Sequence, residues 1–152
     1  MKDYKPPLKL CEIQVSYKPK KAHRPQITSS EDAFRVLLHC YDGATISYRE
    51  EFIVLFLNRA NRVLGYRRIS EGGVAGTVVD AKIILSIALK VAASSLVLSH
   101  NHPSHNVNPS QADIDLTRKI KDACELLDML LLDHIIVAPE GGFYSFADES
   151  LI

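Results

Sequence analysis

The stretch SHNHPSHNVNPSQAD, residues 99–113, holds three of the six histidines of the chain and is its most chemically suggestive segment. His100 and His102 come at the end of a short apolar run that is typical of a buried strand. Side chains at positions i and i+2 of an extended segment point to the same side, so both imidazoles can reach one ion. Such pairs commonly supply two of the nitrogen ligands that zinc prefers. Taken alone, the pair also fits an ordinary polar loop.

Asp113 is the natural third ligand. The residues PSQAD begin a predicted helix, and the spacing of Ser110 and Asp113 also fits a capping box with an acid in the first turn. The two roles are compatible, because Ser110 can cap the helix while Asp113 binds the ion. Three protein ligands leave the fourth tetrahedral position to water, as in catalytic zinc sites.

A catalytic site of this type needs a base that takes the proton of the water without binding the metal. Glu50 and Glu51 stand at the start of the apolar run FIVLFLN and are the candidates. An acid at the end of a buried strand is more often simply solvated, so the residues alone leave both open. The HxHxDH, HExxH and HxE–PCxxC patterns of other zinc enzymes are absent from the sequence.

The elements that must position these residues follow from the apolar periodicity. Strands are predicted at 8–17, 50–58, 63–70, 95–100, 129–138 and 143–147, and helices at 30–42, 81–94 and 110–127. The second and third strands form a hairpin around the turn RANR. Strands and helices mixed in this order indicate an α/β (α+β) layered domain around one sheet.

Local signals also define the helix starts and their buried faces. Ser29 or Ser30 is the expected N-cap of the first helix and Asp80 that of the second, because short polar side chains accept from the free N–H groups there. The residues expected on the apolar faces are Phe34, Leu37, Leu38 and Tyr41 in the first helix, and Ile83, Ile84, Ile87 and Val91 in the second.

The bulk composition is that of one globular domain: 152 residues, 47% hydrophobic and 24% charged. No run approaches the ~18–20 apolar residues of a membrane span, and the N-terminus does not have the pattern of a secretory signal. Three scattered cysteines, Cys11, Cys40 and Cys124, suit a reducing compartment and are expected to be buried. We therefore expect a cytoplasmic protein that does not associate with membranes.

Charge is distributed unevenly although it sums to zero. Residues 1–24 carry seven basic and two acidic side chains, a balance of 7 − 2 = +5. We expect residues 1–27 to form a basic strand, arm and linker, and residues 28–152 to form the folded domain. A basic arm fits weak contact with nucleic acid, and it fits a solvated terminus equally well.

Three segments in combination resemble a known metalloprotease signature. Glu50, His100-Asn101-His102-Pro103 and the run from Ser110 to Asp113 match the JAMM (MPN+) pattern E…H-x-H-P…S-x-x-D. The wider sequence resembles the RadC-like JAB domain of bacteria over roughly residues 28–152. The segments that carry this resemblance are EEFIVLFLNRANRVLGYRRIS, LVLSHNHPS, NPSQADIDLTRKIKDACELLDMLLLDHIIVA and GGFYSFADE.

The resemblance implies a fold and a metal. A JAB/MPN-type domain has a mixed central β-sheet flanked by helices, in a layered architecture like that of cytidine deaminases. Carried over by position, His100, His102 and Asp113 become the ligands of one Zn²⁺ per chain.

The same resemblance implies a reaction, the hydrolysis of a peptide or isopeptide bond. Glu50 becomes the general base, since the family acid stands two residues before an aromatic residue, here Phe52. Ser110 is expected to help stabilise the oxyanion. Asp133 and His134 also match the wording of the family, and we interpret them as structural or supporting residues.

Two departures from the family pattern bear on function. Many relatives have His-Pro-Ser-Gly where this chain has His-Pro-Ser-His at residues 102–105. We expect His105 to be an exposed loop residue. The alternative is that it intrudes on the site or binds a stray metal. Longer members carry an N-terminal helix-hairpin-helix region, and here only the basic arm is recognisable, which suggests a short form.

The competing hypothesis is a DNA-repair or mobile-element-associated protein acting on or near DNA without proteolysis. A non-catalytic scaffold is the third.

Overall fold

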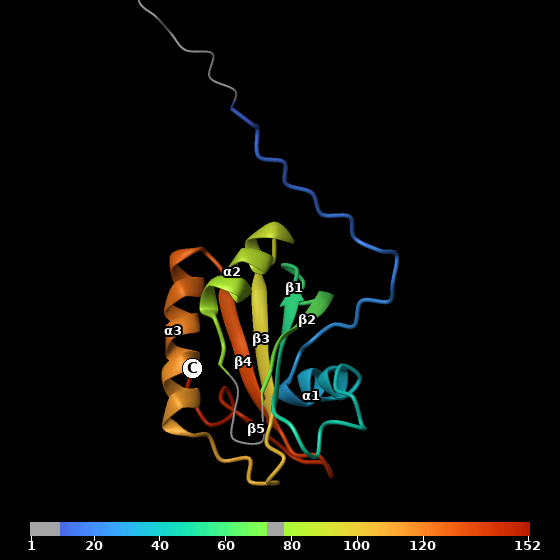
Figure 1. Ribbon diagram of the computed structural model, residues 1–152, viewed down its shortest axis with the longest axis vertical. Helices are drawn as coiled ribbons and strands as arrows, with labels where there is room; N and C mark the ends of the chain where they lie inside the picture. Colours follow the sequence, from blue (N-terminus) through green and yellow to red (C-terminus); the bar gives the residue numbers. More distant parts are fainter. Residues whose placement is uncertain (1–9, 73–77) are drawn as a thin grey trace, which may run out of the picture.

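A five-stranded mixed β-sheet forms the centre of the fold and three helices flank it (Figure 1). The computed structural model describes residues 10–72 and 78–152. The elements in chain order are α1 (Ser30–Leu38), β1 (Glu51–Leu57), β2 (Val63–Glu71), α2 (Ala81–Lys90), β3 (Ser95–Asn101), α3 (Gln111–Leu126), β4 (Leu130–Val137) and β5 (Phe143–Ser145). The expected α/β class with a mixed sheet flanked by helices is confirmed.

The strand order is β2-β1-β3-β4-β5. β1 runs antiparallel to both β2 and β3, so the predicted hairpin is confirmed. β3 and β4 are parallel, and α3 makes the crossover that a parallel pair requires. The short β5 adds to β4 in antiparallel orientation.

The helices cover opposite faces of the sheet, with α1 on one side and α2 and α3 on the other (Figure 1). Alternate residues of β1 therefore serve two cores. Ile53, Leu55 and Leu57 belong to the core under α1, whereas Phe52, Val54 and Phe56 belong to the core under α2 and α3. Every residue of β1 is consequently buried, which explains its almost continuous apolar sequence.

The helix starts are fixed by local caps. The Ser29 hydroxyl accepts a hydrogen bond from the Asp32 N–H at 3.1 Å, and the Asp80 carboxylate accepts from the Lys82 N–H at 2.8 Å. Both predicted N-caps are confirmed. α1 ends earlier than predicted, and Tyr41 lies beyond it with its hydroxyl 2.8 Å from that of Ser99.

The predicted strand at 8–17 is wrong for its described part. Residues 10–17 belong to no strand or helix, and they lead away from the body of the molecule (Figure 1). The apolar side chains there are exposed, among them Leu10, Ile13 and Val15. Alternating hydrophobicity is necessary for a half-buried strand, but a strand also needs a neighbour to pair with, and this segment has none.

Three burial expectations also need correction. Leu38, expected on the apolar face of α1, is 43% exposed. Cys11 lies in the extended segment and is exposed, whereas Cys40 and Cys124 are buried as expected. In α2 the fully buried side chains are Ile84 and Ala88, while Ile83 remains 47% exposed. The buried stripe of α2 is thus narrower than its aliphatic sequence suggests.

Parts of the predictions concern residues outside the described ranges. They include positions 8 and 9 of the first strand and three lysines of the basic arm. Within the described ranges, no helix is both long and apolar enough to cross a membrane.

Candidate metal centre

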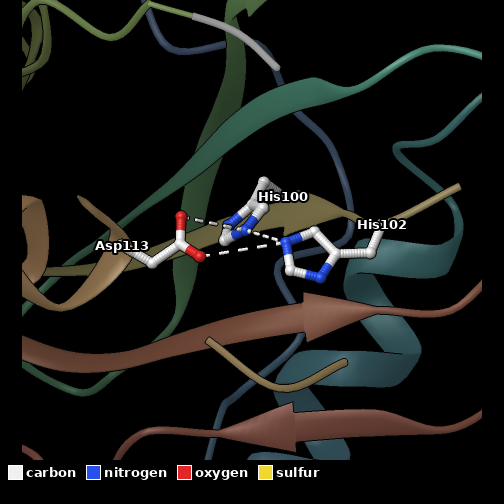
Figure 2. A group of neighbouring side chains, drawn as sticks. All are labelled: His100, His102 and Asp113. Atoms are coloured by element: carbon white, nitrogen blue, oxygen red, sulfur yellow. Dashed lines mark hydrogen bonds and ion pairs between the residues drawn. The ribbon is translucent and has the colours of Figure 1, made fainter. Parts of the chain in front are cut away.

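Three side chains from two elements and the loop between them converge at the carboxyl end of β3 (Figure 2). His100 is the penultimate residue of β3 and His102 follows the strand, while Asp113 lies in the first turn of α3. The potential ligand atoms of these residues all lie within 4.8 Å of one another. The structure therefore brings together the three residues expected to bind metal, in a group that can hold an ion.

The spacing of the three ligand atoms fits a tetrahedral ion. Bonds of about 2.0–2.1 Å place any two ligands of a tetrahedral zinc about 3.3 Å apart. Here the Nε2 atoms of His100 and His102 lie 2.9 Å apart. The Asp113 carboxylate approaches His100 Nε2 at 3.3 Å and His102 Nε2 at 3.8 Å. Shifts of a few tenths of an ångström would complete such a site.

The hydrogen bonds of the outer ring nitrogens also fit a cation. His102 Nδ1 lies 2.5 Å from the backbone oxygen of Asn106, and since a carbonyl only accepts, Nδ1 must donate. His100 Nδ1 lies 2.8 Å from His134 Nε2. With the Nδ1 atoms as donors, each neutral ring presents a lone pair at Nε2. Two lone pairs and a carboxylate that face one another form a donor set of the kind that zinc prefers.

Asp113 caps its helix and faces the histidines at the same time. Its Oδ2 accepts hydrogen bonds from the N–H and the hydroxyl of Ser110, each at 2.7 Å, and the Ser110 hydroxyl accepts from the Asp113 N–H. This is a complete capping box. Partial burial alone would raise the pKa of Asp113. His100 lowers this pKa when both of its ring nitrogens are protonated, because the ring is then charged and Nε2 donates to the carboxylate, and the bonds from Ser110 lower it as well. The pKa is consequently well below its usual range.

The two neighbouring glutamates have different surroundings. Glu51 is fully buried, and its carboxylate pairs with Arg49 Nε at 3.0 Å and Arg68 Nε at 2.8 Å. The hydroxyl of Thr45 donates to it as well, at 2.8 Å. Glu50 is only partly buried and lines a cleft with His102. Of the two, Glu50 is the acid that borders the space beside the histidines.

This cleft has a volume of about 660 Å³. Besides Glu50 and His102, its walls include the aromatic ring of Tyr48, the ring of Pro103 and the amides of two asparagines. The remaining lining residues are Asn106, Asn108, Ser47 and Ser104. The lining thus combines apolar contact surface with uncharged hydrogen-bonding groups.

Asn101, between the two histidines of the cluster, has a structural role that its sequence position alone does not indicate. Its side chain faces the opposite side of the sheet from His100 and is fully buried. Its Nδ2 donates to the backbone oxygens of Ile46 and Arg49, at 2.7 and 2.9 Å, and its Oδ1 accepts from the Glu51 N–H at 2.8 Å. One amide therefore joins β3 to the segment that carries Glu50. The signal in the sequence that could have drawn attention to Asn101 is its position between the two histidines.

Asp133 and His134 are buried on β4, as their interpretation as supporting residues requires. The Asp133 carboxylate accepts from the hydroxyl of Ser145 at 2.6 Å and the N–H of Ala147 at 3.0 Å, tying β4 to the segment after β5. Burial raises the pKa of Asp133 in spite of these bonds. His134 lies behind His100, and burial, with the charges of neighbouring histidines, lowers its pKa well below the usual value.

His105 does not join the cluster and is exposed, as expected. Its N–H donates to the backbone oxygen of His102 at 3.0 Å in a tight turn. Its φ of 64° lies in the left-handed region, which favours glycine.

Comparison with known proteins agrees with this architecture. The sequence matches the family described as the RadC-like JAB domain over residues 27–151. Among similar proteins, the UPF0758 protein of Flavobacterium johnsoniae is 46% identical, over 83% of this chain and 53% of its own length. The UPF0758 protein of Porphyromonas gingivalis is 39% identical, over 85% of this chain and 56% of its own length. The UPF0758 protein of Aquifex aeolicus is 35% identical, over 94% of this chain and 59% of its own length. The chain thus spans little more than half the length of these relatives.

Proposed function

The chain belongs to the RadC-like JAB domain family, and on that premise we propose that it is a JAMM-type zinc-dependent hydrolase that cleaves peptide or isopeptide bonds. One observation carries the proposal: two histidines and an aspartate converge at the edge of a cleft that a partly exposed glutamate also lines. His102 and Glu50 line the same cleft, so an acid that belongs to no ligand group borders the cluster, as metal-assisted hydrolysis requires.

In this proposal His100, His102 and Asp113 hold the ion. A bound zinc ion supplies Lewis-acid polarisation of a carbonyl and lowers the pKa of a coordinated water. Glu50 serves as the general base and later returns its proton to the leaving amine, since its carboxylate borders the cleft. Glu51 is unsuited to this role because Arg49 and Arg68 already neutralise it in a buried site.

Ser110 has a more constrained role than the family signature suggests. Its hydroxyl proton is committed to Asp113 Oδ2 at 2.7 Å. Stabilisation of an oxyanion requires the hydroxyl to rotate away from that bond when substrate binds. We assign Ser110 first to the orientation of Asp113, and second to the oxyanion.

The chemistry of the cleft supports a peptide as substrate. Tyr48 and Pro103 offer apolar contact, and Asn106 and Asn108 can pair with the amides of an extended backbone. Three cysteines without a disulfide suit the bacterial cytoplasm as the compartment in which the reaction takes place.

The proposal is tested by separating metal binding from turnover. Zinc-loaded protein is incubated with a library of unstructured peptides and with a lysine-linked isopeptide, and new amino groups are measured. Glu50→Gln should retain zinc and lose cleavage by at least about 100-fold. Glu140→Gln, an exposed acid in the β4–β5 turn, is the matched control and should cleave as the unmodified protein does. Undiminished cleavage by Glu50→Gln would overturn the assignment of the base.

Weak contact with nucleic acid is the second candidate function, and the exposed part of the basic arm favours it. Lys18, Lys20 and Lys21 lie close together on an extended, exposed segment, and such a segment can follow a phosphate backbone. Binding to duplex DNA should then weaken steeply with salt and disappear when residues 1–24 are removed. Binding that survives this truncation would exclude the arm as the contact.

A further inference from the structure

A chain of three hydrogen bonds, two of them buried, runs behind the metal centre and links two of the proposed ligands. His100 Nδ1 lies 2.8 Å from His134 Nε2, and His134 Nδ1 lies 2.6 Å from the hydroxyl oxygen of Thr117. The Thr117 hydroxyl in turn donates to the backbone oxygen of Asp113 at 2.6 Å. The chain therefore begins on one ligand residue and ends on another.

The chemistry of its last member sets the direction of every bond. A backbone carbonyl can only accept, so the single hydroxyl proton of Thr117 points to Asp113. The Thr117 oxygen must then accept the proton of His134 Nδ1. A neutral His134 protonated at Nδ1 has a lone pair at Nε2, and that lone pair accepts from His100 Nδ1–H.

We propose that His134 and Thr117 are positioning residues that hold His100 in the tautomer protonated at Nδ1, with the lone pair of Nε2 turned toward the metal position. This inference rests on the proposed function for the identity of the ion. The ring nitrogen that faces the cluster is thereby selected before any ion binds. Metal-bound histidines generally need such a partner on the outer nitrogen, and here a neutral imidazole takes the place of a carboxylate or carbonyl.

Aromatic packing buries and aligns His134, the middle member of this chain of hydrogen bonds, which we call the relay. His134 is fully buried, and its ring stacks on Phe146 with centroids 4.7 Å apart and meets the edge of Phe52 at 5.6 Å. Thr117 is 1% exposed. Thr117 also lies one helical turn after Asp113 on α3, so the same turn presents the carboxylate and anchors the relay.

The tautomers can be measured directly in metal-free protein. Nitrogen-15 spectra of labelled histidine, recorded above the ordinary range of histidine titration, distinguish rings protonated at Nδ1 from rings protonated at Nε2. We expect Nδ1–H for His100 and His134. Assignment of His100 to the Nε2–H form would overturn the proposal.

Paired variants test the effect of the relay on metal binding. Thr117→Val removes the hydroxyl at nearly constant shape and should weaken zinc affinity by about 10- to 100-fold. It should also place part of the His100 population in the Nε2–H tautomer. Thr117→Ser retains the hydroxyl and should bind zinc within about threefold of the unmodified protein.

The outcomes separate this inference from the proposed function. Thermal melting establishes that each variant is folded, and His134→Gln, whose side-chain oxygen can accept from His100, gives a second test if Thr117→Val does not fold. If folded Thr117→Val keeps both its zinc affinity and its tautomers, the relay is overturned while the metal centre stands. If the unmodified protein binds no zinc, the proposed function fails, and the tautomer spectra still decide whether the relay exists.

Discussion

The side chain of Asn101 accepts a hydrogen bond from the backbone N–H of Glu51 at 2.8 Å, across the junction of β3 and β1. Because Asn101 stands between His100 and His102, one side chain couples the strand end that presents the two histidines to the segment that presents Glu50. The histidines and the proposed base belong to segments about fifty residues apart in sequence, and this amide joins them.

Removal of that amide should destabilise the fold. Asn101→Ala leaves the Glu51 N–H and two backbone carbonyls without their partner, and we expect the free energy of unfolding to fall by about 3 kcal/mol. Urea denaturation measures the change. Asn108→Ala, an exposed asparagine in the loop before α3, is the control and should stay within about 0.5 kcal/mol. A loss below about 1 kcal/mol for Asn101→Ala would contradict this role.

Substitutions of the two adjacent glutamates should have different effects on stability. Glu51→Gln removes the charge that pairs with Arg49 and Arg68 in a buried position, and we expect it to lower the free energy of unfolding by about 3 kcal/mol. Glu50→Gln should change stability by less than about 0.5 kcal/mol, because no ion pair of the described residues involves Glu50. Denaturation curves of the two variants provide the comparison, and the reverse order would refute the assignment of their roles.

The loop after His102 should become more stable with glycine at position 105. His105 has a φ of 64°, where a side chain is strained and glycine is not. His105→Gly should therefore raise stability by about 0.5–1 kcal/mol and the melting temperature by roughly 1–4 °C. His105→Ala keeps the strain and should give no such gain. Equal melting temperatures for the two variants would show that backbone strain is not the cause.

Stability should fall at alkaline pH. Burial raises the pKa of Cys40 and of Cys124 from an ordinary value of 9.0 to about 11, and burial raises that of Tyr41 further. The unfolded chain then releases these protons at lower pH than the folded protein does. The stabilising contribution is complete below about pH 9 and is lost as pH rises toward about 11.

Urea denaturation at several pH values checks this dependence. Cys124→Ala should reduce the slope between pH 9 and 11, because one of the groups responsible is then missing. Cys11→Ser, at an exposed position, should leave the profile unchanged. A stability that stays constant over this range would contradict the burial argument.

The grouping of His100, His102 and Asp113 and the helix caps could be predicted from sequence because their signals are local. Ser110 and Asp113 are three residues apart, and the same spacing that makes a capping box also presents a carboxylate at the helix start. His100 and His102 share a side of one extended segment. The strand β1 could likewise be predicted from the composition of its own apolar run.

The remaining features depend on partners that are distant in sequence. Asn101 bonds to residues about fifty positions away, and the relay through His134 and Thr117 exists only because β4 packs beside β3 and α3. Residues 10–17 show the opposite failure. Their alternation is the local pattern of a strand, but no neighbouring strand pairs with them.

Zinc content tests the central claim most directly. Purified protein, dialysed against metal-free buffer after loading with zinc, should retain one zinc ion per chain when measured by elemental analysis. Asp113→Ala should lose most of this zinc, because a tetrahedral site with two protein ligands is weak. Asp115→Ala, an exposed acid on the same helix whose carboxylate accepts from Gln111 at 2.9 Å, should retain it. Full zinc occupancy in Asp113→Ala would contradict the metal centre described here.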